Sequence, residues 1–276
     1  MTITIPLFSI TITIPKIACT ILGIPIYWYG IIIAIAMAVA VILYYKKSGT
    51  YGISFDTILS AFLWVIPFAF LGARLYYVIF RWDYYSSNPS QILQIKNGGL
   101  AIYGGLFVGV AILCFYCKKN KICIRDMLDY VVPEIALAQS IGRWGNFFNV
   151  EAYGVETTLP WKMGIEAQGT NSYVHPTFLY ESICTLGIYL LLHKIEKNRK
   201  WKGQITYLYI TLYSFARMWI EGLRTDSLYL GNIRISQLVS IILFVVFGSI
   251  LFYFAYHNRK MSKKEEKNKK VTYKNA

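Results

Sequence analysis

Residues 26–45 read IYWYGIIIAIAMAVAVILYY, twenty residues without a charged side chain. An α-helix needs about 20 apolar residues to cross the hydrocarbon of a bilayer. Six further apolar runs follow along the 276-residue chain, at 56–80, 100–117, 127–141, 178–193, 204–221 and 235–256. Because 56% of the residues are hydrophobic and only 15% are charged, the composition excludes an ordinary soluble domain. We expect an all-α polytopic membrane protein with about seven transmembrane helices, and residues 1–257 as its single domain.

The distribution of Lys and Arg predicts the orientation of these helices. With the N-terminus outside, nineteen of the 28 basic residues fall in the inner loops and the C-terminal tail, and seven fall in outer segments. Cytoplasmic loops carry the excess of Lys and Arg, so we place the N-terminus outside and the C-terminus in the cytosol. The formal net charge of +14 therefore indicates orientation, and it does not indicate a nucleic-acid partner.

Four regions outside the apolar runs have distinct compositions. Residues 1–23 alternate Thr and Ile, which indicates a short extracytoplasmic strand or an interfacial stretch. The connection 142–177 carries aromatics and glycines, and we expect it to form a small extracytoplasmic head. The tail, 258–276, is rich in Lys, Glu and Asn, which is typical of a disordered, solvated segment. The five cysteines suggest neither a disulfide scaffold nor a metal site, because the one CxxC, at 114–117, stands alone.

The stretch 142–154, GRWGNFFNVEAYG, is dense in polar residues at the edge of an apolar run. Such side chains are costly at a lipid boundary and are usually satisfied internally or used. In the expected topology, other unusual polar residues and glycines fall at the same outer level. They are Tyr29, Arg74, Tyr103, Gly104, Gly105, Arg143, His175, Tyr213, Arg217, Glu221 and Arg224.

The sixth run ends in a stripe of polar residues. Tyr213, Arg217, Glu221 and Arg224 are four, four and three residues apart, which places them on one helix face. Arg217 and Glu221 could form a plain surface ion pair, and Tyr29 could belong to an interfacial aromatic belt. Arginine binds phosphate through paired donors and stays charged. Several arginines at headgroup depth therefore indicate a site for an anionic phospholipid. The sequence contains no Gly-x-Ser-x-Gly motif for a serine nucleophile and no HExxH metal motif.

At these residues the chain resembles the bacterial prolipoprotein diacylglyceryl transferases. Residues 142–154 match that family's pattern Gly-Arg-x-Gly-Asn-Phe-x-Asn-x-Glu-x-x-Gly at every fixed position. Trp-Tyr-Gly at 28–30, Tyr-Gly-Gly-Leu at 103–106 and His-Pro-Thr-x-Leu-Tyr-Glu at 175–181 support the match, as does Arg217-x-x-x-Glu221-x-x-Arg224. The resemblance runs in order from about residue 20 to 257.

The resemblance implies an enzyme of the bacterial cytoplasmic membrane, with its active site toward the extracytoplasmic leaflet. Such enzymes transfer the diacylglyceryl group of phosphatidylglycerol to the lipobox cysteine of a prolipoprotein signal peptide, and need no cofactor or metal. The implied catalytic residues are Arg143, Arg217, Tyr103 and Glu221. The implied substrate-binding residues are Arg143, Asn146, Glu151, Gly154, Tyr29, Tyr213, Arg74, Gly104 and Gly105.

Two positions depart from the family pattern. Many members have a histidine, thought to be the base, where this chain has Tyr103, and a glutamine where it has Phe178. An ordinary tyrosine, with a pKa near ~10, is a poor base, so Tyr103 is expected to position or relay, and His175 is a further candidate base. A transporter or channel for an anionic solute would use the same arginines, and a non-catalytic lipid-binding scaffold is a third alternative.

Overall fold

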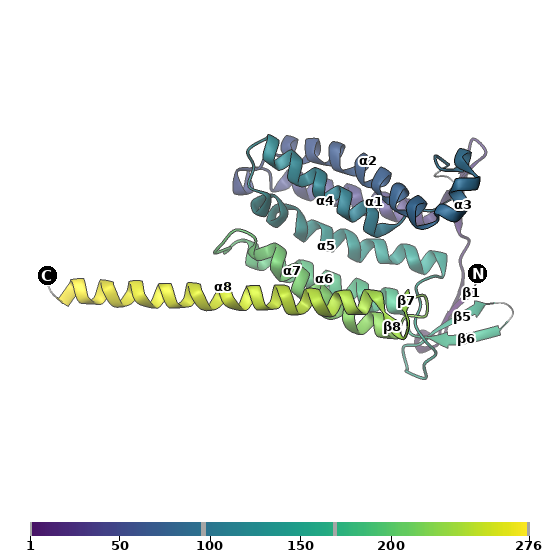
Figure 1. Ribbon diagram of the computed structural model, residues 1–276. Coiled ribbons are helices and arrows are strands. Elements are labelled where there is room, and N and C mark those ends of the chain that lie inside the picture. The colour runs from purple at the N-terminus through teal and green to yellow at the C-terminus, as the bar shows by residue number, and fades with distance from the viewer. Residues whose placement is uncertain (1, 95–97, 168–169, 275–276) are drawn as a thin grey trace. The chain divides into compact units, whose positions relative to one another are not determined.

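The computed structural model describes residues 2–94, 98–167 and 170–274. The chain forms two compact units: Met1–Leu43 with Val132–Ala276, and Tyr44–Val131. We call them the first and the second unit and describe each by itself. Most residues are helical, and a small part forms sheets (Figure 1).

Five helices in the described residues are long and apolar enough to cross a membrane, which supports a helical membrane protein. Because they contain long apolar runs with few charges, they satisfy the length and composition that the hydrocarbon requires. These helices are α1 (Trp28–Lys46), α2 (Phe55–Phe80), α4 (Ile102–Lys119), α6 (Thr177–Glu196) and the part Ile235–His257 of α8 (Ile235–Lys274).

The other two expected spans form helices that are more polar. They are α5 (Ile124–Asn149) and α7 (Gln204–Leu223), and both bury charged side chains, including Glu134 and Glu221. They are not among the five helices apolar enough to span a membrane. The count of seven spans and their orientation therefore stay predictions.

In the first unit, α5, α6 and α7 share a hydrophobic core, and α8 packs along α7 (Figure 1). Val132 and Ala136 of α5 contact Ile188 and Leu192 of α6, with Ile205 of α7 completing the cluster. This packing joins α5, which carries Arg143 and Asn146, to α7, which carries Tyr213, Arg217 and Glu221.

The structure corrects one boundary. The apolar run was expected to end at 141, but α5 continues to Asn149, so Arg143 and Asn146 are helical and the head begins after them. Gly145 allows close packing within this helix, because a Cβ there would lie 2.7 Å from the ring of Tyr29.

The head contains a β-sheet, so the expected all-α class is also too narrow. The sheet is antiparallel with strand order β2-β1-β5-β6, built from β1 (Thr2–Ile5), β2 (Ile10–Thr13), β5 (Met163–Ala167) and β6 (Thr170–Val174). Ile3 pairs with Ile165, and both are buried against Phe147 and Phe178. The prediction of a strand in the Thr/Ile alternation is confirmed, and the N-terminal segment belongs to the head.

Two short hairpins and several turns complete the first unit. One hairpin joins β3 (Ile17–Ile21) to β4 (Ile24–Tyr27), directly before α1, and the other joins β7 (Tyr229–Leu230) to β8 (Ile233–Arg234). A 3-10 turn, Pro6–Phe8, connects β1 to β2. Helix α8 continues to Lys274. The expected disorder of the tail stays a prediction.

The second unit is built on α2 and α4, which cross closely. Gly104 lies against Gly72 and Tyr76 of α2, and Gly105 lies against Ala69. Side chains at these glycines would separate the two backbones, since small residues allow helices to approach. The unit also holds α3 (Trp82–Ser87) and the 3-10 turns Thr50–Gly52 and Pro89–Gln91.

Candidate active site

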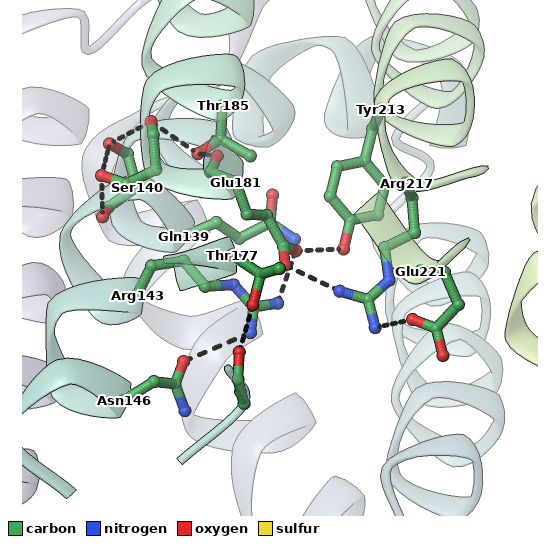
Figure 2. A network of polar contacts seen from close by, with 12 residues as sticks. Gln139, Ser140, Arg143, Asn146, Thr177, Glu181, Thr185, Tyr213, Arg217 and Glu221 are labelled. Carbon is green, nitrogen blue, oxygen red and sulfur yellow. Dashed lines mark hydrogen bonds and ion pairs between the residues drawn. The ribbon is translucent and has the colours of Figure 1, made fainter. Parts of the chain in front are cut away.

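The buried carboxylate of Glu181 is the centre of a polar cluster in the first unit (Figure 2). Its Oε1 accepts hydrogen bonds from Arg143 Nη2 at 2.6 Å and from the Tyr213 hydroxyl at 3.0 Å. Its Oε2 accepts from Arg217 Nη1 at 2.7 Å. Only 2% of the surface of Glu181 is exposed, so it is paired with two arginines inside the protein.

Helix α7 supplies the opposite side of this cluster. Tyr213, Arg217 and Glu221 lie one turn apart and face α6, and Arg217 Nη2 is 2.5 Å from Glu221 Oε2 (Figure 2). The predicted stripe is confirmed for these three residues, and the Arg217–Glu221 ion pair is present. Arg224 lies beyond the end of α7 and pairs with Asp226 at 2.7 Å. We use the name Glu181 cluster for Glu181, Arg143, Arg217, Tyr213 and Glu221.

Arg143 connects the cluster to the end of α5. Its Nη1 donates to Asn146 Oδ1 at 3.3 Å, and Asn146 Nδ2 donates to Glu151 Oε1 at 2.9 Å. Asn149 Nδ2 reaches the same Glu151 oxygen at 3.3 Å. Three polar residues of the 142–154 stretch therefore extend one hydrogen-bonded chain from Arg143.

Gly154 and Tyr29 have close packing contacts within the same unit. The Gly154 amide donates to the His175 carbonyl at 2.9 Å, and a Cβ there would lie 2.8 Å from that of His175 and 3.0 Å from the Leu223 carbonyl. Gly154 thus allows the head to approach the end of α7 and the start of α6. The ring of Tyr29 rests over Gly145, two residues from Arg143 in the sequence.

Hydrogen bonds from hydroxyl side chains of α5 and α6 fix the backbone that carries Glu181. The Thr185 hydroxyl donates to the Glu181 carbonyl at 2.7 Å, and the Ser140 hydroxyl of α5 donates to the Ser182 carbonyl of α6 at 2.8 Å. The Thr177 hydroxyl donates to the Ala152 carbonyl. The carboxylate is therefore held on a helix that is joined to its neighbours, which is how a site keeps its geometry before a ligand binds.

The candidate base His175 lies at the start of α6 and contacts Tyr180. Its Nδ1 is 3.2 Å from the Tyr180 hydroxyl, which also accepts a 2.8 Å hydrogen bond from Trp161 Nε1. Through Tyr180, this arrangement connects His175 to Trp161 of the head, so His175 has a role in ordering the loop that carries Trp161. Phe178, in place of the family's glutamine, lies in an apolar cluster with Phe147 and Trp144.

Arg74 has a different environment from the one expected. In the second unit its guanidinium donates to five backbone carbonyls, with donor–acceptor distances from 2.7 to 3.5 Å; they belong to Gln91, Ile92, Gln94, Gly98 and Gly99. The residue is 6% exposed. Because a guanidinium has five N–H donors, these bonds occupy it fully, and we assign Arg74 to holding this loop.

Tyr103, Gly104 and Gly105 also belong to the second unit. Tyr103 is the second residue of α4, and the two glycines lie at its contact with α2. Their grouping with the Glu181 cluster around one substrate stays a prediction.

Sequence reasoning missed the central position of Glu181. It was recognised as part of the 175–181 stretch but received no role, although an acidic side chain at the start of an apolar run is itself an indication of function. The two arginines and two glutamates of the cluster balance in formal charge. The Arg143 side chain is 24% exposed and its contacts with Asn146 and Glu181 use two of five donors, so donors remain for an oxyanion.

Comparison with known proteins agrees with these features. The family model described as prolipoprotein diacylglyceryl transferase matches residues 16–254. A phosphatidylglycerol--prolipoprotein diacylglyceryl transferase of Finegoldia magna is 49% identical over 237 residues, which cover 86% of this chain and 94% of that protein. Proteins with the same name from Clostridioides difficile and Clostridium novyi are 47% and 45% identical, and they cover 82% and 85% of this chain and 90% and 93% of their own lengths.

Proposed function

The chain belongs to the prolipoprotein diacylglyceryl transferase family, and from that premise we propose that it carries out the first step of bacterial lipoprotein maturation. It transfers the diacylglyceryl group of phosphatidylglycerol to the lipobox cysteine of a prolipoprotein signal peptide. The bond between the diacylglyceryl carbon and the phosphate oxygen breaks, and a bond between that carbon and the cysteine sulfur forms. Glycerol phosphate leaves with the electron pair, and the thiol loses its proton.

The observation that carries the proposal is the pair of arginines held on one buried carboxylate. Two guanidiniums repel each other, and Glu181 offsets this repulsion, so both cations are in place before a ligand arrives. Arg143 and Arg217 then bind the phosphate through their remaining donors and stabilise the charge that grows on it as it leaves. Glu221 and Tyr213 are positioning residues, since they contact Arg217 and Glu181.

Several other expected site residues take supporting roles. Asn146 and Glu151 extend from Arg143 and provide hydrogen bonds for the glycerol hydroxyls, while Gly154 leaves room at the boundary with the head. Tyr29 positions the headgroup from α1. Tyr103 positions the substrate or relays a proton. The positive charges of Arg143 and Arg217 favour the thiolate form of the substrate cysteine, which helps its thiol to lose the proton.

We further propose seven transmembrane helices in the bacterial cytoplasmic membrane, with the N-terminus outside and the C-terminus in the cytosol. The excess of Lys and Arg in the inner segments supports this topology. Helices α5 and α7 cross the membrane as well, because the Arg143 and Arg217 charges are paired with glutamates inside the protein. The Glu181 cluster then opens toward the extracytoplasmic leaflet.

Reconstitution tests the proposal directly. The purified protein in phosphatidylglycerol vesicles is incubated with a lipobox peptide, and the peptide mass is measured. We expect a gain of one diacylglyceryl group in the wild type, its loss in Arg143→Ala and Arg217→Ala, and its retention in Arg81→Ala, which alters an exposed arginine after α2. A wild-type protein that adds no mass, under conditions in which the Finegoldia magna relative does, contradicts the enzyme assignment.

A further inference from the structure

The β3–β4 hairpin has one apolar face. Its register pairs Ile21 with Ile24 and Cys19 with Ile26, while Thr20 pairs with Pro25. Directly paired residues lie on the same face of a hairpin, and successive residues alternate between faces. Cys19, Ile21, Ile24 and Ile26 therefore share one face, which we call the hairpin apolar face, and Thr20 and Pro25 lie on the other.

The hairpin apolar face is largely uncovered by the described residues. Ile21 is 55% exposed, Ile24 is 67% exposed, and Leu22 at the tip is 96% exposed. Leu22 has a φ of +50°, a conformation that Leu rarely adopts, so a large apolar side chain is presented there against local preference. An isolated two-stranded hairpin is marginal in water, and a contiguous apolar patch usually marks a contact surface.

The hairpin is continuous with a membrane-long helix. β4 ends at Tyr27 and α1 begins at Trp28, whose amide donates to the Lys16 carbonyl at the base of the hairpin, at 3.2 Å. With about 3.4 Å per strand residue, the tip lies within roughly 20 Å of the N-terminal end of α1. The headgroup region on each side of the hydrocarbon is only about 6 Å thick, so an upright hairpin would carry its apolar tip into water.

We propose that the β3–β4 hairpin lies on the bilayer at the N-terminal end of α1, with the hairpin apolar face and Leu22 among the upper acyl chains. The partner is thus a lipid surface. Thr20 and Pro25 face the headgroups and water, and the aromatic pair Tyr27 and Trp28 marks the interface. The hairpin holds the start of α1 at a fixed depth, and this assignment does not depend on the transfer reaction.

Fluorescence quenching in reconstituted vesicles tests the orientation of the two faces. A variant that keeps Cys19 as its one cysteine carries an environment-sensitive label, and the matched control carries the label at Thr20→Cys with Cys19→Ser. We expect lipids with a shallow spin label to quench the Cys19 adduct more strongly, and aqueous iodide to quench the residue-20 adduct more strongly. Equal iodide quenching at both positions overturns the proposal. Protection of Cys19 from both quenchers also overturns it, because protein would then cover the face.

A second measurement avoids removal of the other cysteines. The protein with its natural cysteines, and the Thr20→Cys variant, react in vesicles with a membrane-impermeant maleimide, and peptide mapping reads each position. We expect residue 20 to react about tenfold faster than Cys19, because thiol reactivity follows exposure to water. Equal rates at the two positions contradict the proposal.

Discussion

Replacing Glu181 with glutamine keeps the shape of the side chain and removes the negative charge between two guanidiniums. Arg143 and Arg217 each place a nitrogen within 2.7 Å of this carboxylate. With charge centres about 4 Å apart and an effective dielectric constant of about 20, each attraction is about 4 kcal/mol, and the repulsion between the guanidiniums about 6 Å apart is about 3 kcal/mol. The gross balance of about 5 kcal/mol is reduced by desolvation, and breaking a buried pair typically costs 3–5 kcal/mol.

The expected result of Glu181→Gln is a large loss in both stability and turnover. A loss of about 3 kcal/mol or more corresponds to a melting temperature lowered by roughly 10 °C for a protein of this size, or to turnover lowered by at least about a hundredfold. Melting is followed in detergent by intrinsic fluorescence, and turnover by the mass gain of a lipobox peptide in phosphatidylglycerol vesicles.

A matched control removes one contact from the same carboxylate. Tyr213→Phe loses a single 3.0 Å hydrogen bond to Glu181, which is worth about 1.5–3 kcal/mol for a charged acceptor. We therefore expect its effect to be smaller than that of Glu181→Gln. If Glu181→Gln melts within about 2 °C of the wild type and keeps turnover within about threefold, the role of Glu181 as the holder of both arginines is refuted.

Three further predictions concern other parts of the chain. Tyr103→Phe should keep measurable transfer activity, because an ordinary tyrosine is a poor base and is not the proton acceptor; a complete loss at normal protein yield would contradict this. Gly145→Ala should leave the helix content unchanged by circular dichroism but displace the ring of Tyr29, 2.7 Å from the new methyl group, and raise the KM for phosphatidylglycerol; an unchanged KM would remove Tyr29 from the site. Hydrogen bonds from Arg224 lower the pKa of Asp226 below its ordinary value. The Arg224–Asp226 pair therefore stabilises the fold fully at a pH above the ordinary pKa of aspartate. This stabilisation is lost as the pH falls through the lowered pKa of the folded protein. Asp226→Asn should therefore lower the melting temperature slightly at pH 7, and the decrease should become smaller as the pH falls below the ordinary pKa of an aspartate. A decrease that does not depend on pH would contradict this linkage.

The sequence predicted much of the helical site because helical spacing is read directly from it. Tyr213, Arg217 and Glu221 occur at intervals of four, and the structure places them on one face of α7. Contacts within one helix need no knowledge of the tertiary fold, which is why this prediction succeeded. Arg143 and Asn146 also contact each other along α5, but the sequence had placed both of them after the end of the helix.

Contacts between helices were not predicted, because they depend on packing. Nothing in the spacing of Glu181 and Arg143, 38 residues apart, shows that they form a 2.6 Å ion pair. The β-sheet of the head was missed for the same reason, since β1 and β5 are separated by more than 150 residues in the chain. The partners of Gly142 and Gly145 could not be predicted either. A Cβ at these positions would lie 3.4 Å from Ile33 and 2.7 Å from the ring of Tyr29, both of which come from a distant part of the chain.

The five carbonyl contacts of Arg74 affect how tolerant this chain is to mutation. A lysine at this position would offer three hydrogens from one nitrogen to carbonyls arranged around a planar fork. Arg74→Lys and Arg143→Lys would then look equally damaging in a growth assay, although the first would release a loop and the second would weaken phosphate binding. Protein yield in the membrane separates the two variants. A loss of growth on mutation of a buried arginine is therefore not by itself evidence that the arginine binds substrate.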